Sequence, residues 1–197
     1  MTTDRLKRAV DAIDRANRED PNLETANGQK YPKEWLYGER MSQWLLRLRP
    51  EPSDLQQLAA RGQHIFRWKI PRSEYPQTRE CYLRWRKQLY RYHGDRVVEI
   101  MAAEGYDTDS MDQVKRMIGK QGIKRDHDVQ LIEDTACLVF LEFYLQPFAA
   151  GQPEEKLIDI IRKTWDKMSD VARGHALKID YPAPIASVLG IALQAGD

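Results

Sequence analysis

The sequence predicts an all-α protein, a helical bundle that forms a single domain over residues 1–197. Apolar residues recur at spacings of three and four through nearly every segment, which is the period of an amphipathic helix. No run rich in Val, Ile and Thr alternates apolar and polar residues as a half-buried strand does. The composition, with 42% hydrophobic and 31% charged residues, suits helices that bury one face and expose the other.

The first part of the chain predicts two helices separated by polar breaks. The first is expected over residues 6–17 and stops at Pro21, because proline cannot continue a helix. A polar loop that contains Gly28 follows. Pro32 suits the first turn of a second helix, which is expected over residues 32–48.

A third helix is expected after Ser53, whose side chain can cap it. Its periodicity continues toward His64 and Trp68. Pro71 and Pro76 then bracket a loop.

The remaining segments predict longer and more apolar helices. The longest covers about residues 78–103, and a shorter one covers 107–121. Asp126 or Asp128 can cap the next helix, which is the most apolar of the chain. These later helices are expected over residues 129–148, 153–168 and 185–193.

The bulk properties exclude several classes of protein. The sequence contains no run of 18 apolar residues, so no transmembrane helix and no membrane partner are expected. The charged first residues lack the apolar region of a secretion signal, which predicts a cytoplasmic protein. Cys81 and Cys137 have no metal-site or disulfide-framework spacing and are expected to be reduced thiols.

Charge is distributed unevenly along a chain whose formal net charge is +1. Residues 61–96 contain ten Lys and Arg against three Asp and Glu, whereas residues 126–197 contain six against twelve. Such a basic segment attracts phosphate or carboxylate groups. The alternative is that it neutralises the acidic end of the chain within the fold. The charge as a whole does not indicate a dedicated nucleic-acid binder.

The stretch from residue 63 to residue 72 combines a titratable base, cations and an aromatic face. His64 supplies the base, and Arg67 and Arg72 can bind phosphate through paired N–H groups. Trp68 supplies the aromatic face. The alternative is that His64 closes a helix as a C-terminal cation and Trp68 packs in the core.

Three residues of the longest predicted helix extend this basic surface. Arg79, Arg86 and His93 lie seven residues apart, which places them on one helix face. They are expected to line the same anion site as Arg67 and Arg72. The alternative is a solvated basic face or ion pairs with the acidic C-terminal helices.

Glu133 and Asp134 stand at the head of the most apolar helix. Buried carboxylates need partners, because an unpaired buried charge is costly. A metal, a substrate or arginines of the basic segment can serve, and the alternative to a functional site is a structural Arg–carboxylate network. A divalent metal suits carboxylates, but no complete ligand set accompanies them. The cofactor is therefore left unassigned.

Several strings along the chain resemble the domain of unknown function 4202 family, and together they span nearly its whole length. The family supplies no activity. The strings are PKEWLYGERMS at 32–42, QHI and RW at 63–65 and 67–68, IPR and YP at 70–72 and 75–76, YL and WR at 82–83 and 85–86, ED and CLVFLE at 133–134 and 137–142, and EKLIDI at 155–160.

In a weaker resemblance, the run from residue 37 to residue 64 is spaced like the opening of HD-type metal-dependent phosphohydrolases. In this resemblance Tyr37 takes the position of the first histidine, Gln63 and His64 that of the His-Asp pair, and Asp134 that of the last aspartate. The resemblance implies an HD-like helical scaffold. Tyr and Gln are poor metal ligands, so it does not imply the metal.

The observations together predict an anion-binding cleft for a phosphorylated small molecule or nucleotide. If the protein is an enzyme, hydrolysis or transfer at phosphate is the expected class, with His64 as acid/base and with Glu133 and Asp134 orienting water or a cation. The alternative is a non-catalytic module that contacts protein or RNA through its Arg, Trp and Tyr residues. The oligomeric state is not predicted.

Overall fold

The computed structural model describes residues 4–194 and confirms the all-α prediction. Helices account for most of the chain, and the sheet consists of two short strands. Within the described residues, no helix is both long enough and apolar enough to cross a bilayer. The helices are α1 (Asp4–Arg18), α2 (Lys33–Leu48), α3 (Asp54–Arg61), α4 (Arg79–Ala103), α5 (Thr108–Ile118), α6 (His127–Val139), α7 (Leu145–Ala149), α8 (Glu154–Trp165), α9 (Asp170–Ala176) and α10 (Ala183–Gln194).

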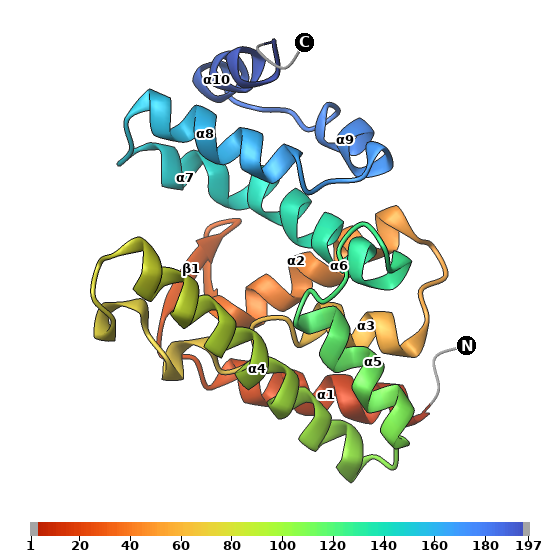
Figure 1. Ribbon diagram of the computed structural model, residues 1–197. Coiled ribbons are helices and arrows are strands. Elements are labelled where there is room, and N and C mark those ends of the chain that lie inside the picture. Colours follow the sequence, from red (N-terminus) through yellow and green to blue (C-terminus); the bar gives the residue numbers. More distant parts are fainter. Residues whose placement is uncertain (1–3, 195–197) are drawn as a thin grey trace.

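The helices pack in two halves around a continuous apolar core. In Figure 1, α1, α4 and α5 form the lower half, α8, α9 and α10 form the upper half, and α2 and α6 lie between them. Helix α4 packs against α5, α2 against α6, and α8 against α10. Fully buried side chains such as Met41, Leu58 and Leu138 fill the space between these pairs. The two halves are therefore joined through the central pair.

Side-chain caps begin several helices where the sequence predicts them. Ser53 forms a capping box with Gln56 at the start of α3. Asp126 rather than Asp128 caps α6, because its side chain accepts from the backbone N–H groups of Asp128 and Val129. Each cap satisfies N–H groups that have no partner within the helix.

The polar loop around Gly28 is a β-hairpin, which the sequence interpretation missed. Strands β1 (Leu23–Ala26) and β2 (Gln29–Pro32) pair antiparallel. Asn27 and Gly28 have φ angles of 51° and 76°, and a two-residue turn with positive φ at both positions favours Asn-Gly. Arg40 of α2 and Glu24 of β1 form an ion pair that ties the hairpin to the helix.

Helix α3 ends at Arg61 and does not continue to Trp68 as expected. At Gly62 the chain passes so close to α4 that an added Cβ would lie 2.3 Å from Val97 Cγ2. Phe66 then takes a left-handed φ of 54°, which is uncommon for a large side chain. Two short 3₁₀ turns follow, η1 (Arg67–Lys69) and η2 (Arg72–Glu74). The segment after α3 is therefore irregular, and at Gly62 it lies against α4.

The upper half differs from the prediction in two places. The expected helix over 129–148 is one helical path whose middle, η3 (Phe140–Tyr144), is a π-helical turn between α6 and α7. Helix α9 was not predicted.

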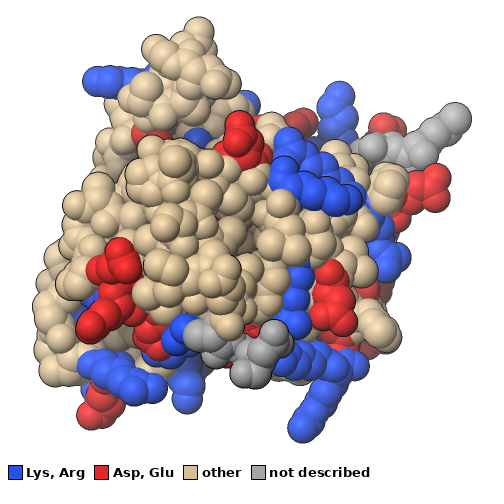
Figure 2. All heavy atoms as spheres, turned by 90° about the horizontal axis from the view of Figure 1, so that it is seen from above, with Lys and Arg blue, Asp and Glu red and all other residues tan. Residues whose placement is uncertain are grey.

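Figure 2 shows the upper face, where uncharged side chains cover the middle and charged side chains lie toward the edges. Helix α10 itself contains no charged residue.

Candidate functional site

A cavity of about 1290 Å³ opens between α4 and α8. The irregular segment after α3, the turn after α5 and the aromatic side chains of Phe140 and Phe148 complete its walls. We call it the cationic cleft, because the charged side chains along it are mostly basic. Its cations are Arg67, Arg72, Arg79, Arg86, Lys120, Lys156, Lys163 and Lys167, and its carboxylates are Asp159 and Asp166.

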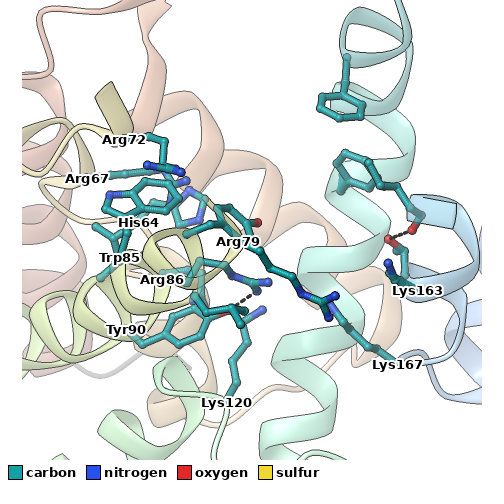
Figure 3. A pocket seen from close by; sticks show the side chains of 18 of the residues that line it. His64, Arg67, Arg72, Arg79, Trp85, Arg86, Tyr90, Lys120, Lys163 and Lys167 are labelled. Carbon is teal, nitrogen blue, oxygen red and sulfur yellow. Dashed lines mark hydrogen bonds between the residues drawn. The ribbon is translucent and has the colours of Figure 1, made fainter. Parts of the chain in front are cut away.

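The cations stand on two facing walls. Figure 3 shows Arg67, Arg72 and His64 on one side of the cleft and Lys163 and Lys167 on the other. Helix α4 supplies Arg79, Arg86 and His93 to the first wall, as their spacing of seven predicts. Helix α8 and the turn after it supply the facing lysines.

The guanidinium groups of the first wall differ in their contacts with other protein groups. Arg72 donates to the backbone carbonyl groups of Tyr75 and Pro76, at 2.8 and 2.9 Å, which fixes its guanidinium in the loop. Arg67 stacks over the Trp85 ring at 4.9 Å and lies 3.9 Å from a Glu34 oxygen. Each guanidinium keeps N–H groups for a ligand, because it has five donors.

Arg86 is half-buried and has no carboxylate in salt-bridge distance among the residues that the structure describes. Its contacts are aromatic: it donates to the Tyr90 hydroxyl and lies near the Tyr82 and Tyr90 rings. A guanidinium shielded from water in this way usually has a direct ion pair, but the carboxylate whose charge acts on Arg86, Glu133, lies beyond salt-bridge distance and pairs with Lys120. The position is therefore suited to an anion.

His64 is held in the cleft by two residues of α2. Its Nδ1 lies 3.1 Å from Glu34 Oε2, and its ring stacks on Tyr37 with centroids 3.8 Å apart. Burial and the neighbouring Arg67 and Lys120 hold the pKa of the His64 imidazole well below its usual value. Burial also raises the pKa of Glu34 to about 7, although Arg67 acts in the opposite direction. The pair thus keeps a neutral imidazole that one carboxyl group orients.

His93 and Gln63 lie at the inner end of the cleft, and both side chains are 1% exposed. The carbonyl oxygen of Ile65 accepts a hydrogen bond from His93 Nδ1 at 2.7 Å. Gln63 Nε2 donates to the Ile118 carbonyl at 3.4 Å. The second polar atom of each side chain has no partner among residues 4–194.

Glu133 does not line the cleft but stands behind two of its lysines. Lys120 forms a buried ion pair with it, and Lys167 Nζ lies 3.7 Å from its other oxygen. Burial alone would raise the pKa of the Glu133 carboxyl, but Lys120 and Lys167 outweigh it and hold the pKa below its usual value. The ion-pair partners of this carboxylate are lysines, and not the arginines of the basic segment that the sequence offered as one alternative.

Asp134 is directed toward α9. One oxygen accepts from the Ser169 N–H at 2.9 Å and from Gln130 Nε2 at 2.8 Å, and the other accepts from the Ser169 hydroxyl at 2.6 Å. Trp68 also lies outside the cavity lining and packs edge-on against Phe66, with centroids 5.5 Å apart. Of the predicted site, the structure brings together His64, Arg67, Arg72, Arg79, Arg86 and His93.

The local partners of the basic segment leave the cleft cations available. Arg84 pairs with Glu80, Arg96 with Glu99 and Arg61 with Asp14. Within residues 4–194, no ion pair joins the basic segment at 61–96 to the acidic end of the chain. In the described part of the chain, the acidic end therefore does not pair with the arginines of the first wall, whereas it does pair with the cleft residues Lys120, Lys163 and Lys167.

Sequence reasoning missed one whole wall of the cleft. Lys156, Lys163 and Lys167 follow a spacing of seven and four, which is the signal of a shared helix face. Glu34 was missed for another reason, since it contacts His64 from 30 residues away and only the fold brings it there. Tyr37 entered the sequence interpretation only through the HD-type resemblance.

The positions behind the HD-type likeness do not all converge. Tyr37 stacks on His64 and Gln63 precedes it in the wall, but Asp134 binds Ser169 elsewhere. Within the described part of the chain, no group of three or more His, Cys, Asp and Glu side chains is arranged to hold a metal ion.

Comparison with protein families gives one match. A family model described as "Domain of unknown function (DUF4202)" matches residues 7–189. Comparison with curated proteins and with solved structures finds no match.

Proposed function

The chain belongs to the DUF4202 family, and we propose that the protein binds a phosphorylated small molecule or nucleotide. The family description names no activity, so support for this function comes from the cleft. Both cysteines are free thiols, which suits a protein of the reducing cytoplasm. The ligand-binding proposal rests on the charge and the size of the cavity.

The observation that supports the proposal is the imbalance of charge along the cleft. Eight Lys and Arg side chains line it against two carboxylates, Asp159 and Asp166. Asp159 is paired with Lys163 at the surface. Cations gathered in one concave site raise the local concentration of anions. A phosphate group matches them because it accepts several charge-assisted hydrogen bonds at once.

Arg86 is one of the cleft cations that have no ion pair among the described residues. It is half-buried, and it touches aromatic rings and a hydroxyl group but no carboxylate among residues 4–194. Lys120 lies near it, as Figure 3 shows. We therefore assign the phosphate position to the surroundings of Arg86, with Arg67 and Arg72 beside it.

Hydrolysis or transfer at phosphate is the reaction that these residues would serve. His64 is neutral and faces the same cavity, so its imidazole can accept a proton from water or from a hydroxyl nucleophile. Glu34 orients the ring and can stabilise the imidazolium that forms. Glu133 and Asp134, which were predicted to orient water or a cation, bind Lys120 and Ser169 instead, so Glu34 is the carboxyl group that contacts His64.

Titration calorimetry with inorganic phosphate and adenosine monophosphate tests the proposal. Arg86→Gln is expected to weaken binding at least about tenfold, which corresponds to the loss of one hydrogen bond to a charged group. Arg84→Gln is the matched control, since Arg84 lies two residues away on α4 and pairs with Glu80 at the surface. It should change affinity by less than about twofold.

Two outcomes would contradict the proposal. One is wild-type protein that binds neither probe, and the other is equal loss in the Arg84 and Arg86 variants. Absence of binding together with co-purification of a protein or RNA would favour the non-catalytic interaction module instead.

A further inference from the structure

Two hydrogen-bonding atoms at the inner end of the cleft lack a partner. They are Nε2 of His93 and Oε1 of Gln63, and both side chains are 1% exposed. Buried polar atoms in native proteins almost always have a hydrogen-bond partner, and leaving one unsatisfied is costly. Gln63 and His93 both line the cleft, so a group that reaches its inner end can supply the missing hydrogen bonds.

The neighbours of the two side chains determine that both free atoms are acceptors. The Ile65 carbonyl can only accept, so the proton of neutral His93 is on Nδ1 and its Nε2 carries a lone pair. The Ile118 carbonyl likewise binds the amide nitrogen of Gln63 and leaves the amide oxygen free. Burial keeps the pKa of His93 well below its usual value, so this imidazole stays neutral. The missing partner must therefore be a donor.

We propose that His93 Nε2 and Gln63 Oε1 accept hydrogen bonds from an uncharged hydroxyl or amino group of the phosphorylated ligand. This inference rests on the proposed function and adds the class of ligand: a phosphate ester that also carries a neutral donor, as sugar phosphates and nucleotides do. A phosphate dianion is excluded from the inner end, because two lone pairs would face its oxygens. An ammonium group is disfavoured by the eight cations of the cleft.

The spacing of the two sites along α4 fits a ligand of this kind. Arg86 and His93 are seven residues apart on one face, so their Cα atoms are separated by about 10 Å along the helix axis. The phosphate would bind at Arg86 and the donor group near His64 and His93, whose ring centroids are 5.8 Å apart.

Calorimetry with methyl phosphate and ribose 5-phosphate tests the inference, since only the second probe carries hydroxyl donors. The wild-type protein is expected to bind ribose 5-phosphate at least about fivefold more tightly. His93→Asn keeps a donor for the Ile65 carbonyl and removes the Nε2 acceptor, and Gln63→Met removes the amide at similar length. Each variant should lose most of the fivefold preference, and its affinity for methyl phosphate should stay within about twofold of wild type.

A nuclear magnetic resonance readout keeps the test valid if a variant fails to fold. The ¹⁵N shift of His93 Nε2 in the wild-type protein should change when ribose 5-phosphate is added and stay unchanged with methyl phosphate. Equal affinity for the two probes, or preference retained in both variants, would overturn the inference and leave the proposed function standing. Failure of inorganic phosphate, methyl phosphate and ribose 5-phosphate to bind would overturn both.

Discussion

At the scale of single residues, the contact between Glu34 and His64 makes the protonation of the cleft depend on pH. Glu34 is 6% exposed and lies beside an imidazole that burial keeps neutral. Its carboxyl group can thus either accept a hydrogen bond from His64 Nδ1 or, when protonated, donate one. Because the pKa of Glu34 is raised to about 7, both forms are populated near neutral pH.

The effect of Glu34→Gln on the free energy of unfolding should be more favourable at pH 8 than at pH 5. In the folded protein the Glu34 carboxyl stays protonated up to about pH 7, whereas the ordinary pKa of this group is 4.5. Between these values unfolding releases a proton, so the contribution of Glu34 to stability is present at low pH and is lost as pH rises through the window. Glutamine cannot ionise, and it keeps an amide donor for His64.

Urea denaturation of both proteins at pH 5 and pH 8 measures this effect. The stability of Glu34→Gln minus that of wild type should increase by about 2–3 kcal/mol from the lower to the higher pH, since one pKa unit corresponds to about 1.4 kcal/mol. A difference that is constant or that decreases with pH would show that Glu34 is ionised throughout.

Residues of the cleft were predictable from the sequence where they are close in the chain or follow a helical period. His64, Arg67 and Arg72 cluster within nine residues, and Arg79, Arg86 and His93 follow a spacing of seven. Glu34 gives no such signal, because its relation to His64 exists only after α2 and the segment behind α3 pack together.

At the scale of elements, helix position was predictable because caps and prolines mark the ends. Ser53 and Asp126 begin α3 and α6, as expected. The hairpin at 23–32 was missed although Asn27-Gly28 marks its turn, since its strands are only four residues long. The end of α3 depends on the close approach of Gly62 to α4, which no local pattern reveals.

Asp134→Ala is expected to destabilise the protein by about 3 kcal/mol and to leave phosphate affinity within about twofold of wild type. Asp134 accepts from both the N–H and the hydroxyl of Ser169, the residue that caps α9, and from Gln130. Alanine leaves these donors without an acceptor in a half-buried site. The substitution therefore loosens α9 from α6, and Asp134 itself is not a lining residue of the cleft.

Thermal denaturation and calorimetry with phosphate separate the two effects. Asp170→Ala is the matched control, because this neighbouring carboxylate is exposed and, among residues 4–194, pairs with Arg173 on its own helix. It should cost less than about 1 kcal/mol. If Asp134→Ala kept wild-type stability and lost phosphate binding, the catalytic role expected from the sequence would be favoured over the structural one.

At the scale of the whole molecule, charge is separated although the chain is almost neutral. The basic segment at 61–96 was recognisable from composition. The lysines of α8 were not, because they lie in a part of the chain where acidic residues predominate. Folding sets these two groups on facing walls of one cavity, so an excess of positive charge remains across the cleft although Lys163 pairs with Asp159 and Lys167 with Glu133.

Sodium chloride should therefore act in opposite directions on the stability and on the ligand affinity of the protein. Screening reduces repulsion across the cleft, since the Debye length falls from about 10 Å at 0.1 M salt to about 3 Å at 1 M. The melting temperature without phosphate should rise by a few degrees, and phosphate affinity should fall by about tenfold between 0.05 and 0.5 M. Arg79→Gln should reduce both responses, because Arg79 is an exposed cation of the first wall. A melting temperature that falls with salt, or an affinity that ignores it, would mean that the facing cations do not govern the energetics of the cleft.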